Sequence, residues 1–85
     1  MKKTEQMNTE EKIQDENRKI RHVRLLVDFT GSMLMQAEMS VTEMFSLIQA
    51  TRNAVLAIFP EKEAVFDLIY KPRFERIIQE RLKSN

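Results

Sequence analysis

The stretch SVTEMFSLIQATRNAVLAIFP, residues 40–60, decides the fold because it holds a helix start, an apolar helical repeat and a stop. Ser40 followed by Glu43 matches a capping box, in which each side chain bonds the backbone amide of the other residue. Apolar residues then recur at helical spacing as far as Pro60, and polar residues occupy only a narrow wedge. A helix that is apolar around so much of its circumference packs against neighbours on several sides.

Downstream of this helix the sequence predicts two more. Pro60 and Glu61 suit a first helical turn, where a missing amide does no harm and an acidic side chain meets the positive helix end. This third helix should end near Tyr70, because Lys71 precedes Pro72 and is disfavoured in helical geometry. Pro72 can then open a last helix whose apolar side is formed by Phe74, Ile77, Ile78 and Leu82.

Upstream, residues 18–39 fit two patterns. As a helix, they place Ile20, Val23, Val27 and Leu34 at steps of three, four and seven residues. As a strand, residues 22–30 alternate between polar and apolar side chains with one interruption, at Leu26. The apolar pattern continues past residue 30, and no second strand is visible in the chain, so the helix is favoured and the strand stays open.

The strand alternative carries a resemblance. A strand from Arg21 to Thr30 followed by two helices resembles the element order of ribbon-helix-helix repressors, with Ser40-Val41 opening the second helix. The resemblance covers about half of the chain and would imply that two chains pair one strand each. The segment 31–39 is short for the first helix of that family, which puts the comparison in doubt.

Length and composition bound the architecture. Eighty-five residues make at most one domain, and a single glycine with two prolines leaves too few turn residues for an all-β fold. Residues 1–17 contain only three apolar side chains, so we expect a polar, partly disordered tail there. Residues 18–85 should form one all-α domain, a small bundle or helical hairpin of three to four helices.

Several kinds of site are excluded by residue type. The chain has no cysteine and one histidine, His22, so we expect no metal site built on thiolates or on several histidines. A phosphate-binding loop needs more than the single glycine of this chain. No nucleophile lies at a spacing from His22 that matches a known catalytic motif, so we expect a protein that binds no cofactor and is not an enzyme. No apolar run suits a membrane span or a signal peptide, which favours the cytoplasm.

The apolar content suggests how the protein works. A chain of this size buries only roughly 60% of its unfolded surface, and three short segments here are apolar on nearly every side. We therefore expect a non-catalytic interaction or assembly module that binds protein, as a homodimer or with another partner. The candidate interface residues are Leu25, Phe29, Met33, Leu47, Leu56 and Phe66.

Charged residues supply two further candidates. Arg52 falls inside an apolar arc, so we expect it to form a buried ion pair with a carboxylate such as Asp28 or Glu38. Basic residues cluster within 18–24 and 71–83, and an alternative function is nucleic-acid binding as in a transcription regulator. The net charge of +1 gives no general support to that alternative. Its candidate phosphate contacts are Arg18, Lys19, Arg21, Arg24, Arg73 and Arg76.

Overall fold

The computed structural model describes residues 9–84, and within them the chain is helical with no strand. Helix α2 spans Thr9–Gln36 and helix α3 spans Val41–Ile58. A C-terminal arm, residues 60–84, follows without a break in helical structure. It consists of the 3₁₀ turn η1 (Pro60–Lys62), α4 (Glu63–Val65), the π-helical turn η2 (Phe66–Tyr70) and α5 (Lys71–Ser84).

Helix α2 settles the ambiguity in residues 21–30. All ten are α-helical, so the strand interpretation is wrong, and with it the resemblance to ribbon-helix-helix repressors. The buried residues of α2 are Val27, Thr30 and Leu34, whose steps of three and four residues form one helical face. Gly31 lies inside the helix with no positive φ, and an added Cβ would meet nothing within 4 Å. The glycine therefore marks neither a break nor a close contact.

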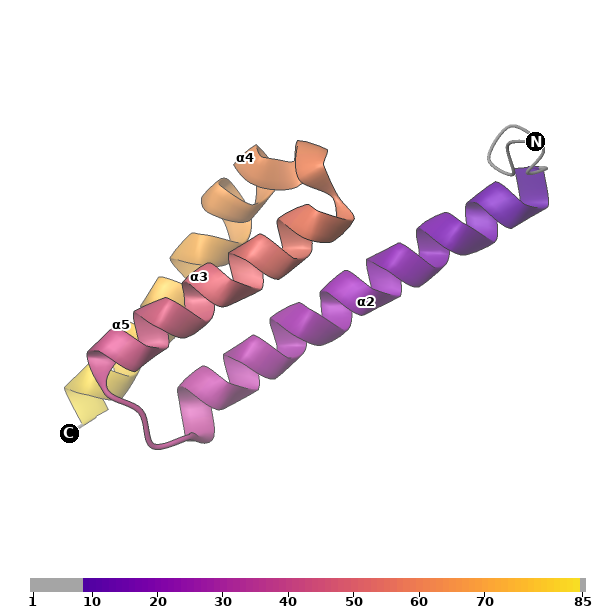
Figure 1. Ribbon diagram of the computed structural model, residues 1–85. Coiled ribbons are helices and arrows are strands. Elements are labelled where there is room, and N and C mark those ends of the chain that lie inside the picture. The colour runs from indigo at the N-terminus through magenta and orange to yellow at the C-terminus, as the bar shows by residue number, and fades with distance from the viewer. Residues whose placement is uncertain (1–8, 85) are drawn as a thin grey trace.

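The N-terminal part of α2 takes in some of the expected polar tail. Residues 9–17 are helical, and residues 1–8 lie outside the described part of the chain. Figure 1 shows this end of α2 extending beyond the other helices. Ile13 belongs to this part of α2, and 54% of its surface is exposed.

Helix α3 begins as its sequence predicts. The Ser40 amide donates to Glu43 Oε1 at 2.8 Å, and the Glu43 amide donates to Ser40 Oγ at 3.1 Å. This reciprocal pair satisfies two of the amides that a helix start leaves without intrahelical partners. At the other end the helix stops before Phe59, and Pro60 opens the next helical turn.

The helix break expected at Lys71-Pro72 is absent, because helical structure continues through both residues. Lys71 has helical angles, φ −60° and ψ −47°, and its amide donates to the Phe66 carbonyl five residues back. This wider π-helical spacing lets the chain absorb the proline, which has no amide to donate, without leaving the helix. The two helices expected on either side of Pro72 are therefore one continuous arm.

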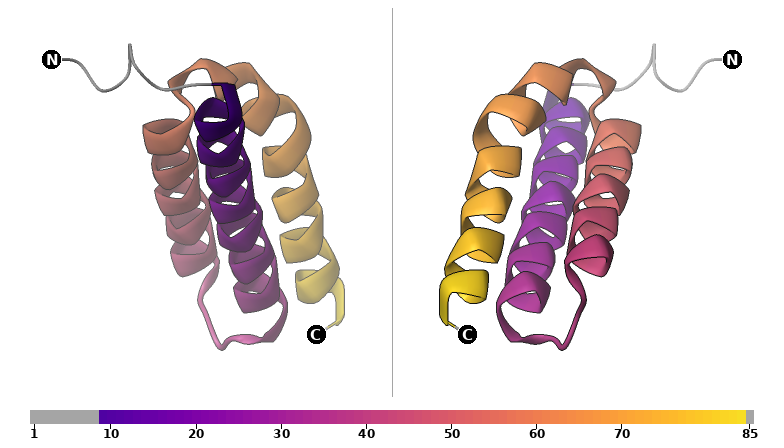
Figure 2. Two further views of the ribbon diagram at one scale, coloured as in Figure 1. Left: turned by 90° about the vertical axis from the view of Figure 1, so that its right-hand side faces the viewer. Right: turned by 90° about the vertical axis from the view of Figure 1, so that its left-hand side faces the viewer.

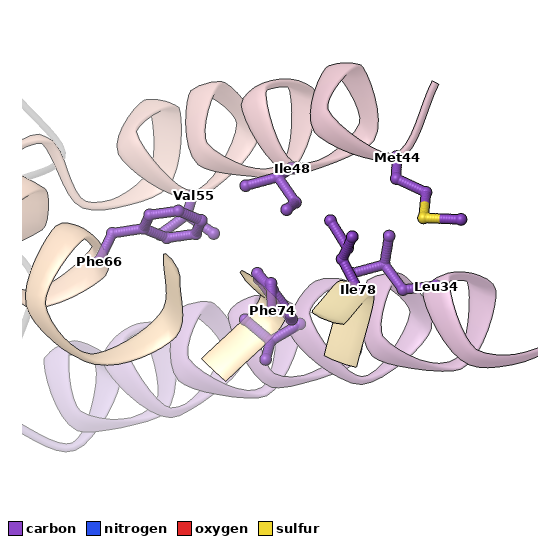
Figure 3. Packing of buried hydrophobic residues seen from close by; sticks show 8 residues of the cluster. Leu34, Met44, Ile48, Val55, Phe66, Phe74 and Ile78 are labelled. Carbon is purple, nitrogen blue, oxygen red and sulfur yellow. The ribbon is translucent and has the colours of Figure 1, made fainter. Parts of the chain in front are cut away.

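Helix α2, helix α3 and the C-terminal arm pack as a bundle. Figure 2 shows α3 and the C-terminal arm side by side with α2, and the molecule measures 57 × 20 × 18 Å. The core runs along the shared axis, where Figure 3 shows side chains from all three rods pointing toward one another. Its buried members in that view include Leu34, Met44, Ile48, Val55, Phe66, Phe74 and Ile78.

Arg81 ties the arm to the end of α2. Its Nη1 donates to the Leu34 carbonyl at 2.7 Å, and the last turn of α2 has no basic side chain of its own. A cation at a helix C-terminus interacts favourably with the carbonyl groups that lack intrahelical donors there. None of the helices in residues 9–84 is sufficiently long and apolar to cross a membrane.

Candidate functional site

An apolar strip on α2, defined as Leu25, Phe29 and Met33, is the first candidate surface. Its members follow one another at four-residue steps and so lie along one side of the helix. Val27, Thr30 and Leu34 turn the opposite side of α2 toward the core. Leu25 is therefore left 62% exposed and Phe29 59% exposed, while Met33 is half-buried.

The remaining candidate interface residues do not all join this strip. Half-buried Leu47 precedes Thr51 by one helical turn, and Thr51 bonds Thr30 of α2, so Leu47 lies on the side of α3 that meets α2. Leu56 follows Arg52 by one turn on the other side, which faces the C-terminal arm. Phe66 has no exposed surface at all and is part of the core, so it cannot contact a partner.

Arg52 forms the predicted structural ion pair, but its partners differ from the predicted ones. Its Nε donates to Asp67 Oδ1 at 2.8 Å, and its Nη2 donates to Glu63 Oε2 at 2.8 Å and to Asp67 Oδ2 at 3.1 Å. Asp28 is exposed on α2 instead, because Arg52 points to the flank of α3 that meets the C-terminal arm. The Arg52 side chain keeps 21% of its surface exposed, so the pair is only partly buried.

These contacts shift the protonation equilibria of both partners. Hydrogen bonding to the guanidinium holds the pKa of the Asp67 carboxyl below its ordinary value, despite partial desolvation that acts the other way. The two carboxylates raise the pKa of Arg52 above its already high value. Asp67 and Arg52 therefore stay charged at neutral pH, and the contact fastens the arm to α3.

A buried hydroxyl pair joins α2 to α3 and was missed at the sequence level. Thr30 and Thr51, with 2% and 5% of their surfaces exposed, share a hydrogen bond across the interface. Thr51 also donates to the Leu47 carbonyl at 2.9 Å, so its single proton is committed there and Thr30 must be the donor between the two. Single threonines in two helices carry no pattern that predicts such a pair.

The candidate phosphate contacts lie on two helices. Arg18, Arg21 and Arg24 are exposed and follow one another at three-residue steps, so they lie along one side of α2, whereas Lys19 points to another side. Lys19 lies 3.6 Å from Asp15 and within 6.0 Å of the centre of the Phe59 ring. On the arm, Arg73 covers the Tyr70 ring at 5.9 Å and Arg76 is exposed. Arg73 and Arg76 are also three residues apart, so each cluster places some of its cations on one side of its helix.

A groove between α2 and the C-terminal arm is the second candidate surface. It encloses a cavity of about 460 Å³. Its floor and walls are mostly apolar, and its charged lining residues come from α2, η1 and α5. The lining consists of Ile20, Val23, Arg24, Val27, Asp28, Val55, Phe59, Lys62, Val65, Phe66, Tyr70 and Arg73.

The described residues contain no grouping of three or more histidine, cysteine, aspartate or glutamate side chains that could hold a metal ion. Every buried side-chain nitrogen or oxygen in that part of the chain has a hydrogen-bond partner. In comparisons with known proteins, the chain matches no family model, no curated protein and no solved structure.

Proposed function

We propose that this protein is a non-catalytic assembly module that associates with a second copy of itself through the apolar strip of α2. The observation that carries the proposal is the exposure of Leu25 and Phe29, 62% and 59%, one turn apart on the same side of a helix. Contiguous apolar surface on a small protein is typical of interaction sites, whereas single exposed apolar residues are ordinary.

The geometry of the strip suits a symmetric contact. A two-fold axis across the strip would run the two α2 helices antiparallel and set Leu25 of each copy against Phe29 of the other. One contact would then cover both strips, which is the property of an isologous interface. Half-buried Met33, one turn beyond Phe29, would extend the contact at the end of the strip.

The expected strength of this contact is modest. Removing one exposed Leu or Phe side chain from water contributes roughly 1.5–3 kcal/mol. Association itself costs about 4–15 kcal/mol in lost freedom of motion. Four such side chains in a dimer are comparable with that cost, so we expect a dimer that forms at high protein concentration and dissociates on dilution.

Size-exclusion chromatography with light scattering tests the proposal through a matched pair of variants. Leu25→Gln with Phe29→Gln should return the protein to a 10.1 kDa particle, because the strip becomes polar while the helix is kept. Leu68→Gln with Ile69→Gln removes equally exposed apolar residues from the C-terminal arm, 76% and 50% exposed, and should leave the dimer intact. Equal loss in both variants would mean that the strip has no special role.

Nucleic-acid binding is the alternative function. Arg18, Arg21 and Arg24 lie along one side of α2, but Asp28 follows Arg24 by one helical turn, and Lys19 is paired with Asp15. The net charge of +1 also lacks the excess of cations that is typical of a nucleic-acid-binding protein. We therefore do not propose this function for the chain.

A further inference from the structure

The groove between α2 and the C-terminal arm has an apolar interior that is reached from solvent. The apolar lining that solvent reaches includes Ile20, 44% exposed, and half-buried Val23, both from α2. Val65 and Tyr70, which are partly exposed, line the groove from the arm. A volume of about 460 Å³ lies within the range in which pockets bury most of a small ligand.

Three cations lie around this interior. Arg24 comes from α2, Lys62 from η1 and Arg73 from α5, and all three are exposed. Among residues 9–84 no ion pair joins any of them to a carboxylate, whereas Arg52 and Lys19 both have acidic partners. Asp28 is the one acidic side chain in the lining, so the groove carries an excess of positive charge beside an apolar cavity.

We propose that this groove binds an amphiphilic monoanion, an aliphatic carboxylate whose chain fills the cavity and whose head group meets Arg24, Lys62 and Arg73. Charge complementarity selects the anion, because the lining holds three cations and one acidic side chain. The solvent-reached apolar lining selects the aliphatic chain. The site is independent of the apolar strip, since Val23 and Val27 of the groove lie on a different side of α2 from Leu25 and Phe29.

Decanoate is the probe, used below its micellar concentration and followed by calorimetry and by the fluorescence of Tyr70. Tyr70 is the only tyrosine, the chain has no tryptophan, and the residue lines the groove, so its emission reports on this site. We expect saturable 1:1 binding. Octanoate should bind more weakly by up to roughly 15-fold, because each buried methylene is worth about fourfold in affinity. Neutral decanol should bind more weakly than decanoate.

A charge variant and its control separate the head-group contacts from general attraction. Arg24→Gln with Lys62→Gln should weaken decanoate binding by about two- to fivefold for each cation removed. Arg18→Gln with Arg76→Gln makes the same change in net charge outside the groove and should leave the affinity unchanged. Equal weakening in both variants, or none in the first, would overturn the proposal.

A second experiment tests the proposal by filling the groove with a larger side chain. Val65→Trp adds a large side chain at a residue that is already 37% exposed, so the fold should persist, as circular dichroism would check. Decanoate binding measured by calorimetry should then be lost. Unchanged binding to this variant would overturn the proposal. It would also be overturned if Tyr70 emission changed with protein concentration but not with decanoate, since a second copy would then be the occupant.

Discussion

At the scale of single residues, the contact between α2 and α3 depends on two threonine hydroxyls in an otherwise apolar layer. Thr30 donates to Thr51, and Thr51 donates to the carbonyl of Leu47. The chain of bonds leaves neither hydroxyl without a partner, which is the condition under which buried polar groups are tolerated. A register shift between the two helices would break it, so the pair specifies the alignment of α2 on α3.

Removing one member of this pair should cost more than removing both. Thr51→Val keeps the side-chain volume but leaves the buried Thr30 hydroxyl without its acceptor, so we expect a loss of about 1–3 kcal/mol in the free energy of unfolding. Thr30→Val with Thr51→Val leaves no orphaned group and should be closer to the wild type. Urea unfolding of the three proteins measures this, and additive losses would contradict the account.

Asp67 makes stability depend on pH. Because Arg52 lowers the pKa of Asp67 in the folded protein, the unfolded chain takes up the proton more readily as pH falls. The stabilisation is therefore fully present above the unfolded pKa, which is close to 3.8, and is lost as pH falls through the lower folded value. We expect Asp67→Asn to flatten the acid limb of the stability curve measured by urea unfolding. An unchanged acid limb would show that the ion pair does not contribute.

At the scale of elements, the start of α3 is defined by local chemistry. The capping box of Ser40 and Glu43 was predicted from two residue types three positions apart, and both of its hydrogen bonds are present. Such a motif is predictable because all of its atoms belong to one short segment.

The cap gives a direct prediction for α3. Ser40→Ala removes the acceptor for the Glu43 amide and should cost about 1 kcal/mol in the free energy of unfolding. Ser46→Ala is the control, since Ser46 is exposed within the same helix and should change stability little. Thermal unfolding followed by circular dichroism compares the two. A similar shift in both would mean that the cap does not stabilise α3.

Elements that depend on distant contacts were harder to predict. Residues 21–30 fitted both a helix and a strand, and the helix was favoured only because the apolar pattern continues beyond them. Which of their apolar side chains are buried depends on how α2 packs against α3 and α5. The helix break expected at Pro72 is absent, because a π-helical turn between Phe66 and Tyr70 removes the conflict with the proline. Sequence patterns describe α-helical spacing. They do not reveal where a backbone hydrogen bond spanning five residues will replace one spanning four residues.

The same limit applies to the candidate sites. The sequence predicted an ion pair for Arg52 because Arg52 lies within an apolar arc. The identity of its partner depends on which helix packs against that side of α3. Leu25 and Phe29 were expected in an interface and are exposed, whereas Phe66 was expected there and is fully buried. Apolar residues on all sides of a helix predict burial, and only the packing of the bundle tells which are covered within the chain.

At the scale of the whole molecule, the bundle covers one side of α2 and leaves the other to solvent. The apolar side chains on the inner faces of α2, α3 and the C-terminal arm are buried in the core. Leu25 and Phe29 of the apolar strip, and the N-terminal turns of α2, are not covered by other elements of the described chain. The proposed self-association through the strip would account for the exposure of Leu25 and Phe29. The dimer is expected to be weak because the strip is short.

The most direct test of self-association is sedimentation equilibrium of the unmodified protein over a wide concentration range. We expect the average mass to rise from the 10.1 kDa of one chain toward twice that value as concentration increases into the high micromolar range. A mass that stays at 10.1 kDa at every concentration would contradict the proposed assembly.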